Sequence, residues 1–96
     1  MERTFNHSHK GELHGITVVV EARESQLFVG RCDTLTAEAI VLLDADVHKE
    51  GQEGHSNKEF LEQVSKFGHW SRHARIVVPR EDILSVRRLG EISLES

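Results

Sequence analysis

The chain of 96 residues contains one cysteine and one proline, and it has no long apolar run. Its single cysteine, Cys32, excludes a disulfide within one chain. A lone cysteine in an apolar stretch is usually a small buried hydrophobe rather than a nucleophile. The longest apolar run is about one strand long, so we expect no segment that spans a membrane. The first residues also lack the apolar core of a signal peptide, and we therefore expect a soluble cytoplasmic protein.

The chain also lacks an excess of positive charge. It has 12 Lys and Arg against 16 Asp and Glu, which gives a formal net charge of -4 at pH 7. Proteins that bind nucleic acid through its phosphates are usually basic, so the balance argues against general binding but is compatible with a local basic patch. The length is that of one small domain, and such domains often gain stability by oligomerisation.

Residues 1–14 are polar and aperiodic, which predicts a flexible arm. The arm contains the pair His7 and His9, with His14 nearby. Two histidines on one face of an extended segment can bind a transition metal, but no cysteine or carboxylate completes a familiar pattern. The interpretation as solvated histidines is favoured, and we expect no metal and no cofactor.

Residues that favour strands predict a mostly β protein. The expected strands are residues 15–23, 27–32, 38–48, 75–79 and 82–89. The first strand is apolar on both faces, so it needs a covering layer on each side. Gly30 lies within the second strand, where it permits a bend or a close backbone approach. The segment 36–45 is also compatible with a helix, but its lack of a polar face favours a strand.

One segment, residues 57–67, predicts an amphipathic helix. Ser56 and Glu59 have the spacing of a capping box before it, and Gly68 follows its last turn. Its apolar stripe must cover an open end of the barrel or a neighbouring subunit. The residues of that stripe are Phe60, Leu61, Val64 and Phe67.

Two clusters of residues carry potential chemistry. The third strand ends with three alternating polar residues, Asp44, Asp46 and His48. They are compatible with an acid–base or metal cluster, or with the solvent face of the strand, and the solvent face is favoured. Trp70 lies among histidines and arginines, where it either stacks on a base or anchors the helix to the barrel, and the anchor is favoured. The sequence contains no recognisable nucleophile–base pair or phosphate-binding glycine loop, so we expect a protein without enzymatic activity.

The apolar strands and the turns between them resemble the Sm-like (LSm) family. The first family motif corresponds to GITVVVEA and QLFVGRCDTLTAEAIVLLDA, with Gly30 at the glycine position and Asp44-Ala45 at the end. The second corresponds to IVVPREDILSV, with Ile83 and Val86 at its apolar positions. The resemblance implies a five-stranded, strongly bent antiparallel SH3-like barrel at residues 15–90. A helical insertion at about residues 56–68 would separate strands three and four, and residues 91–96 would form a tail.

The resemblance also implies a homo-oligomeric ring, in which strand four of one subunit pairs with strand five of the next. The implied interface residues are Ile76, Val77, Val78, Ile83, Leu84 and Val86. If RNA binds, the expected contacts are Asp33, Thr36 and Arg80 near the pore. Arg72, His73 and Arg75 would form a secondary patch, beside Trp70 as a candidate stacking site.

Two departures from the family pattern bear on function. The turn before strand three has no asparagine, and the Arg-Gly pair of the family is replaced by Pro79-Arg80. The sequence therefore leaves two functions open. A ring that acts as an interaction scaffold is slightly favoured, and an RNA-binding ring with a non-standard nucleotide site is the alternative.

Overall fold

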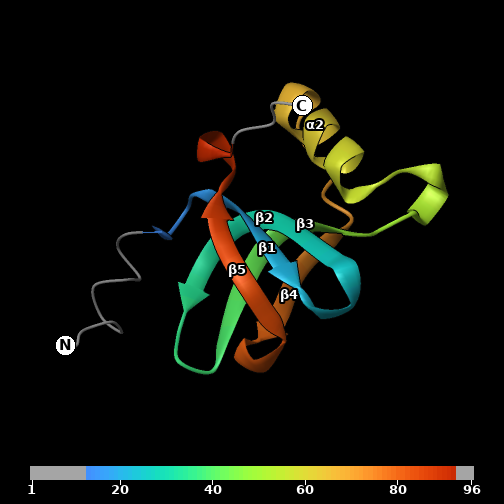
Figure 1. Ribbon diagram of the computed structural model, residues 1–96. Helices are drawn as coiled ribbons and strands as arrows, with labels where there is room; N and C mark the ends of the chain where they lie inside the picture. Colours follow the sequence, from blue (N-terminus) through green and yellow to red (C-terminus); the bar gives the residue numbers. More distant parts are fainter. Residues whose placement is uncertain (1–12, 93–96) are drawn as a thin grey trace.

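The computed structural model describes residues 13–92, and residues 1–12 and 93–96 lie outside this description. The described chain forms one antiparallel sheet of five strands and one α-helix, with short 3₁₀ turns between them (Figure 1). The strands are β1 (Thr17–Ala22), β2 (Gln26–Leu35), β3 (Ala39–Lys49), β4 (His73–Pro79) and β5 (Ile83–Arg88). The helix α2 spans Asn57–Phe67, and the 3₁₀ turns are η1 (Arg23–Ser25), η2 (Gln52–Gly54), η3 (Arg80–Asp82) and η4 (Leu89–Glu91).

The sheet is strongly bent but not closed. Its strand order is β4-β3-β2-β1-β5, and every neighbouring pair is antiparallel. Strands β4 and β5 are therefore the two edges, joined only by the η3 turn. The sequence predicted all five strands and the strong bend of the sheet. The sheet does not close into the complete barrel that the family resemblance implied, because β4 and β5 do not pair with each other.

The long strands β2 and β3 bend at a bulge around Gly30. Their register shifts between Val29 and Arg31, and Asp44 opposite has a φ of +51°. The Asp44 carboxylate forms an ion pair with Arg31 across the two strands. Gly30 thus occupies the bend that the sequence predicted for it, and the extra residue in β3 increases the local twist.

Strand β1 is buried on both faces, as its apolar run predicted. Val18 and Val20 belong to the core inside the bent sheet, together with Ile40 and Leu42, and Cys32 is buried there as expected. Val19 faces the opposite side, where a second cluster also contains Leu27, Val29, Leu61 and Val64. The second layer over β1 is therefore supplied by α2 of the same chain.

The helix forms because its ends are capped and one stripe is apolar. Ser56 accepts a hydrogen bond from the backbone N–H of Glu59, whose side chain accepts one from the N–H of Ser56, which is the predicted capping box. Gly68 follows the last turn with a φ of +84°, and its N–H donates to the carbonyl oxygen of Val64. Phe67 does not belong to the buried stripe as predicted, because its side chain is 83% exposed.

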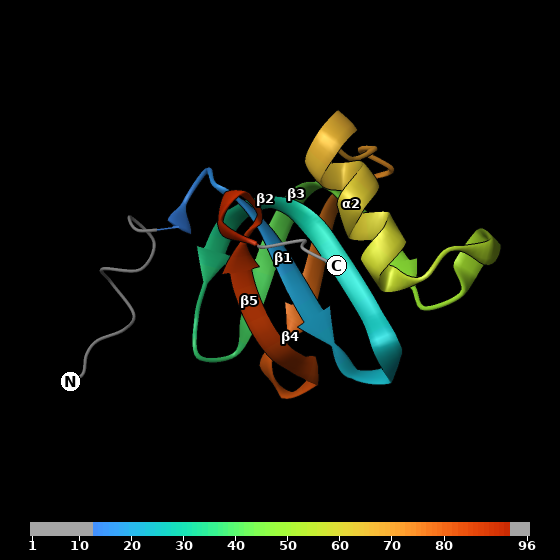
Figure 2. The ribbon, with the colours of Figure 1, turned by 45° about the horizontal axis from the view of Figure 1, so that its top comes forward.

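The helix and two of the turns lie at opposite ends of the sheet. Figures 1 and 2 both place α2 at one end and the β2–β3 and β4–β5 turns at the other. Of the predicted arm, only Leu13 and His14 fall within the described residues, and Leu13 packs against the inner core. Between residues 13 and 92, no helix has the length and apolarity needed to cross a membrane.

Candidate functional site

The β2–β3 and β4–β5 turns bring together Thr36 and Arg80. The guanidinium of Arg80 donates a hydrogen bond from Nη1 to the carbonyl oxygen of Thr36 at 3.3 Å, and its backbone N–H donates to Glu38 at 2.8 Å. The Thr36 hydroxyl accepts from the N–H groups of Glu38 and Ala39 at 3.1 and 3.2 Å, which fixes the turn. We call Asp33, Thr36 and Arg80 the turn site.

Asp33 approaches the same turn along β2. Its carboxylate accepts a hydrogen bond from the Thr34 hydroxyl at 2.9 Å, and its carbonyl oxygen lies 2.8 Å from Nδ1 of His14. The acidic residue Glu38 contacts the cationic residue Arg80 through its carbonyl oxygen, and Asp33 adds a second carboxylate, so the turn site has mixed charge. It offers hydrogen-bonding groups, and it is not a basic cradle for phosphates.

The other predicted nucleic-acid residues lie far from the turn site. Arg80 directly follows β4, whereas Trp70 and Arg72 precede it, and β4 has seven residues. At about 3.3 Å per residue, the two groups are separated by roughly 20 Å along the strand. Arg75 lies on the exposed edge of β4, in register with Leu43, and belongs to neither group.

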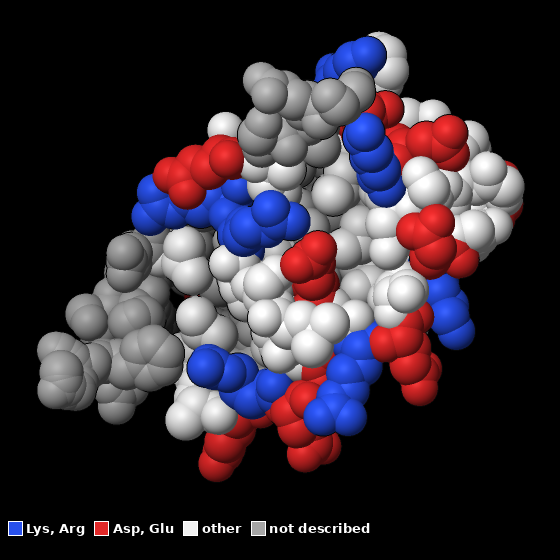
Figure 3. Space-filling view, viewed as in Figure 1, with Lys and Arg blue, Asp and Glu red and all other residues white. Residues whose placement is uncertain are grey.

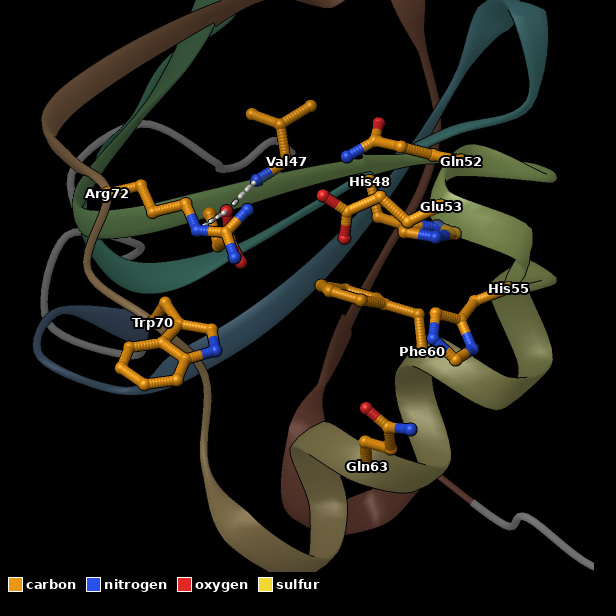
Figure 4. Close-up of a pocket in the computed structure, with 10 residues that line it drawn as sticks. Val47, His48, Gln52, Glu53, His55, Phe60, Gln63, Trp70 and Arg72 are labelled. Carbon is orange, nitrogen blue, oxygen red and sulfur yellow. Dashed lines mark hydrogen bonds and ion pairs between the residues drawn. The ribbon is translucent and has the colours of Figure 1, made fainter.

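A hollow of about 110 Å³ lies where the end of β3, the η2 turn, α2 and the α2–β4 connection meet (Figure 4). We call it the Trp70 hollow. Its wall includes Asp46, His48, Glu53, Phe60, Trp70 and Arg72. Figure 4 shows Trp70 and Arg72 on one side of this space and Glu53 and Phe60 on the other.

Asp46 and Arg72 form the charged pair of the hollow. Asp46 is 2% exposed, and its Oδ1 accepts a hydrogen bond from the N–H of Val47 at 2.9 Å. Nε of Arg72 lies 3.9 Å from the same oxygen (Figure 4). The half-exposed guanidinium of Arg72 is thus the cationic neighbour of the buried Asp46 carboxylate.

His48 and Phe60 stack in the wall of the hollow. Their ring centroids are 4.5 Å apart with an interplanar angle of 12°. Nδ1 of His48 lies 2.9 Å from Oδ1 of Asn57, which ties β3 to the start of α2. Nε2 of the same ring is buried without a hydrogen-bond partner in the described part of the chain.

Two interpretations of these residues from the sequence are wrong. Asp46 and His48 do not form the solvent face of β3, because α2 and its flanking loops cover them and leave His48 only 4% exposed. Trp70 is not a buried anchor, because 71% of its side chain is exposed.

The predicted interface residues divide into inward and outward side chains. Ile76, Val78, Ile83 and Val86 contribute to the core of their own subunit. The outward residues are Val77 on β4, 46% exposed, and Leu84 on β5, 69% exposed. Each edge strand therefore presents an apolar side chain as well as an unpaired backbone.

Charged residues of both signs are mixed on one face of the molecule (Figure 3). On the face shown in Figure 3, Lys and Arg alternate with Asp and Glu over the described residues, without an extended area of one sign. Among residues 13–92, no group of three or more His, Cys, Asp or Glu side chains is arranged to hold a metal ion. The histidines at positions 7 and 9, considered as ligands from the sequence, lie outside the described residues.

Comparison with solved structures identifies the fold. An Sm protein of Pyrococcus abyssii, solved in complex with a uridine heptamer, matches with a TM-score of 0.56 at 18% identity over 91% of this chain and 99% of that chain. A chain of the NatC complex bound to CoA matches with a TM-score of 0.57 at 15% identity over 92% of this chain and 88% of that chain. No protein-family model and no curated protein matches the sequence. The structural likeness confirms the Sm-like fold predicted from the sequence motifs.

Proposed function

We propose that the chain is a non-enzymatic cytoplasmic protein that assembles with copies of itself into a ring and acts as an interaction scaffold. The observation that carries the proposal is the open sheet, in which β4 and β5 are edges that no other strand among residues 13–92 pairs with. Unpaired edges expose rows of backbone N–H and C=O groups that readily pair with another chain. Pairing β4 of one copy with β5 of the next is a head-to-tail contact, which closes into a ring when the rotation permits.

The side chains on the two edges support this contact. Val77 and Leu84 are large apolar residues that the single subunit leaves exposed. Natural edge strands are commonly protected by charged residues that discourage pairing. Burying both side chains between copies would remove apolar surface from water and stabilise the assembly.

The solution mass tests the assembly. We expect a mass several times the 10.9 kDa of one chain, measured by native mass spectrometry. Val77→Lys and Leu84→Lys place a charge on each edge, and each variant is expected to give monomers because both side chains point outward. Phe67→Lys is the matched control, since Phe67 is an exposed apolar residue away from both edges, and its mass should equal that of the wild type. A monomeric wild-type protein refutes the ring.

The scaffold role predicts partners that bind without RNA. The mixed charge on the face shown in Figure 3 and the mixed charge of the turn site favour protein contacts over extended phosphate contacts. The similar chain of the NatC complex was solved as part of a protein complex. Partners captured from a lysate should stay bound after nuclease treatment and should be absent when monomeric Leu84→Lys is the bait. Loss of all partners upon nuclease treatment argues against the scaffold.

The second candidate is RNA binding at the turn site. It is favoured by the contact between Arg80 and Thr36, two of the residues predicted to line the pore. The similar Sm protein of Pyrococcus abyssii was solved with a uridine heptamer. This function requires groups of the turn site to accept a base or a phosphate while Arg80 keeps its bond to the turn.

Fluorescence anisotropy with labelled oligo-U and oligo-A decides between the candidates. RNA binding at the turn site predicts affinity at low salt that falls as salt rises and is weakened by Arg80→Ala. Lys58→Ala is the control, because Lys58 is an exposed cation on α2 at the other end of the sheet. No binding at low salt excludes this candidate, and equal losses in both variants would indicate non-specific attraction.

A further inference from the structure

The Trp70 hollow has the size and composition of a site for one flat ring system. Its volume of about 110 Å³ lies below the roughly 300–1,000 Å³ of sites for drug-sized ligands. The indole of Trp70 borders it and is 71% exposed, so a face of the ring is available for stacking. Stacking on an exposed aromatic side chain is a standard way to hold a nucleobase.

Arg72 supplies directed hydrogen-bond donors beside the indole. Trp70 and Arg72 are two residues apart in the α2–β4 connection, and both side chains line the hollow (Figure 4). Asp46 approaches the guanidinium at Nε, and neither Nη atom has a hydrogen-bond partner among residues 13–92. A buried carboxylate thus holds a guanidinium whose outer donors remain available to a ligand.

The opposite wall supplies acceptors. The Glu53 carboxylate faces Arg72 across the hollow, with the Phe60 ring beside it (Figure 4). Donors on one side and acceptors on the other select a planar ligand that carries both kinds of group on its edges.

We propose that the Trp70 hollow binds a guanine base, stacked on Trp70, with its O6 and N7 accepting from Arg72 and its N1–H and N2–H groups donating to Glu53. Arginine pairs with O6 and N7 of guanine in a bidentate manner. Adenine carries a donor in place of O6, so it cannot accept from the same pair of Nη groups. The proposal concerns the end of the sheet opposite the turn site, and it requires neither the ring nor RNA binding at that site.

The local charge favours a base over a phosphate. The wall contains the carboxylates of Asp46 and Glu53 and the single guanidinium of Arg72, so its charge is negative when the histidines are neutral. A phosphate would meet repulsion there, whereas a base is uncharged. The guanine can come from a free nucleoside or from a single-stranded nucleic acid whose phosphates stay outside the hollow.

The chain provides its own probe, because Trp70 is its single tryptophan. Titrating the full chain with guanosine should quench the tryptophan fluorescence in a saturable way, and adenosine should bind at least about tenfold more weakly. Arg72→Ala and Arg72→Lys should each weaken guanosine binding about tenfold or more, since lysine lacks the fork of donors. Phe67→Ala is the matched control, an exposed aromatic residue at the end of α2 that does not line the hollow, and it should bind as the wild type does.

Further measurements identify the source of the guanine base and test the role of Glu53 in the opposite wall of the hollow. The single-stranded RNAs UUGUU and UUUUU differ by one guanine, and only UUGUU should quench Trp70 and compete with guanosine. Glu53→Gln should weaken guanosine binding without unfolding the protein, because Glu53 is exposed in η2. Arg80→Ala should leave guanosine binding unchanged, which separates this hollow from the turn site.

Three results would overturn the proposal. They are a lack of saturable quenching by both guanosine and UUGUU, equal affinities for guanosine and adenosine, and Arg72 variants that bind as the wild type does. Circular dichroism of each variant verifies that a loss of binding does not come from unfolding.

Discussion

Gly30 and Ala45 approach each other so closely across β2 and β3 that a side chain at position 30 would force the neighbouring strand to shift. A Cβ atom built on Gly30 lies 2.9 Å from Cβ of Ala45 and 3.1 Å from its Cα. Ala45 is completely buried, and the β2–β3 register shifts at this point. The family motif that identified the fold therefore has a packing reason, because the glycine lets two strands touch where the sheet bends.

Replacing Gly30 tests this contact. Gly30→Ala should lower the free energy of unfolding by about 1–3 kcal/mol, because the added methyl group overpacks against a buried strand. Urea denaturation followed by circular dichroism measures the change. Gly90→Ala is the matched control, since a Cβ at Gly90 meets nothing within 4 Å, and its stability should stay within about 0.5 kcal/mol of the wild type. Equal stabilities of the two variants would contradict the close contact.

The capping box should contribute measurably to stability. Ser56→Ala removes the hydroxyl that accepts from the N–H of Glu59, which should cost about 0.5–2 kcal/mol. Ser65→Ala changes the same residue type at an exposed interior position of α2, where alanine is the better helix former, so it should be neutral or slightly stabilising. A neutral Ser56→Ala would mean that α2 is held by packing alone.

The packing of α2 on the sheet gives a larger expected effect. Leu61→Ala should destabilise the protein by about 2–5 kcal/mol, because Leu61 is buried against Val19 and Val29. Phe67→Ala, in the same helix but on the exposed side, should change stability by less than about 0.5 kcal/mol. Thermal unfolding of both variants at equal concentration provides the comparison, and a larger loss in Phe67→Ala would place Phe67 in an interface.

The sequence predicted the elements well because their signals are local. The helix bounds match in full, since Ser56, Glu59 and Gly68 punctuate a clear apolar periodicity. The strand bounds differ by a few residues, with β2 extending to Leu35 through what was expected to be a turn. Turn residues such as Asp33 and Thr34 can continue a ladder when the opposite strand is long enough to pair with them.

The burial of individual polar residues could not be predicted in the same way. Asp46 and His48 alternate with apolar residues as a solvent face does, and only the position of α2 decides that they are covered. The long insertion between β3 and β4 could fold onto either side of the sheet, and nothing local in its sequence says which. For the same reason Trp70 looked like an anchor, although the helix is held through Leu61 and Val64.

The sequence indicated which residues could take part in a site, but it did not indicate which of them lie together in the fold. Arg80 and Thr36 were assigned together through the family motif, and the structure joins them. Trp70 and Arg72 were assigned to the same binding role, but β4 carries them away from the turn site and toward Asp46. The placement of Trp70 and Arg72 near Asp46 depends on how the segment between β3 and β4 crosses the sheet. This is a property of the topology rather than of the local sequence.

Cys32 gives the protein a dependence of stability on alkaline pH. Burial raises the pKa of the Cys32 thiol above its ordinary value of 9.0, and the neighbouring Asp33 carboxylate raises it further. The folded state therefore binds the thiol proton more tightly than the unfolded chain does. This contribution is fully present below the unfolded-state pKa of about 8.5–9 and is lost as the pH rises through the folded-state value.

The comparison of wild type with Cys32→Ala isolates this effect. The alanine variant lacks the thiol, so its unfolding free energy should fall less steeply than that of the wild type between about pH 8 and pH 10. The variant is expected to be less stable at neutral pH because Cys32 packs in the core, so the slope and not the absolute value carries the test. Parallel curves over this range would show that the thiol titrates alike in both states, in contradiction to its burial between β2 and the inner core.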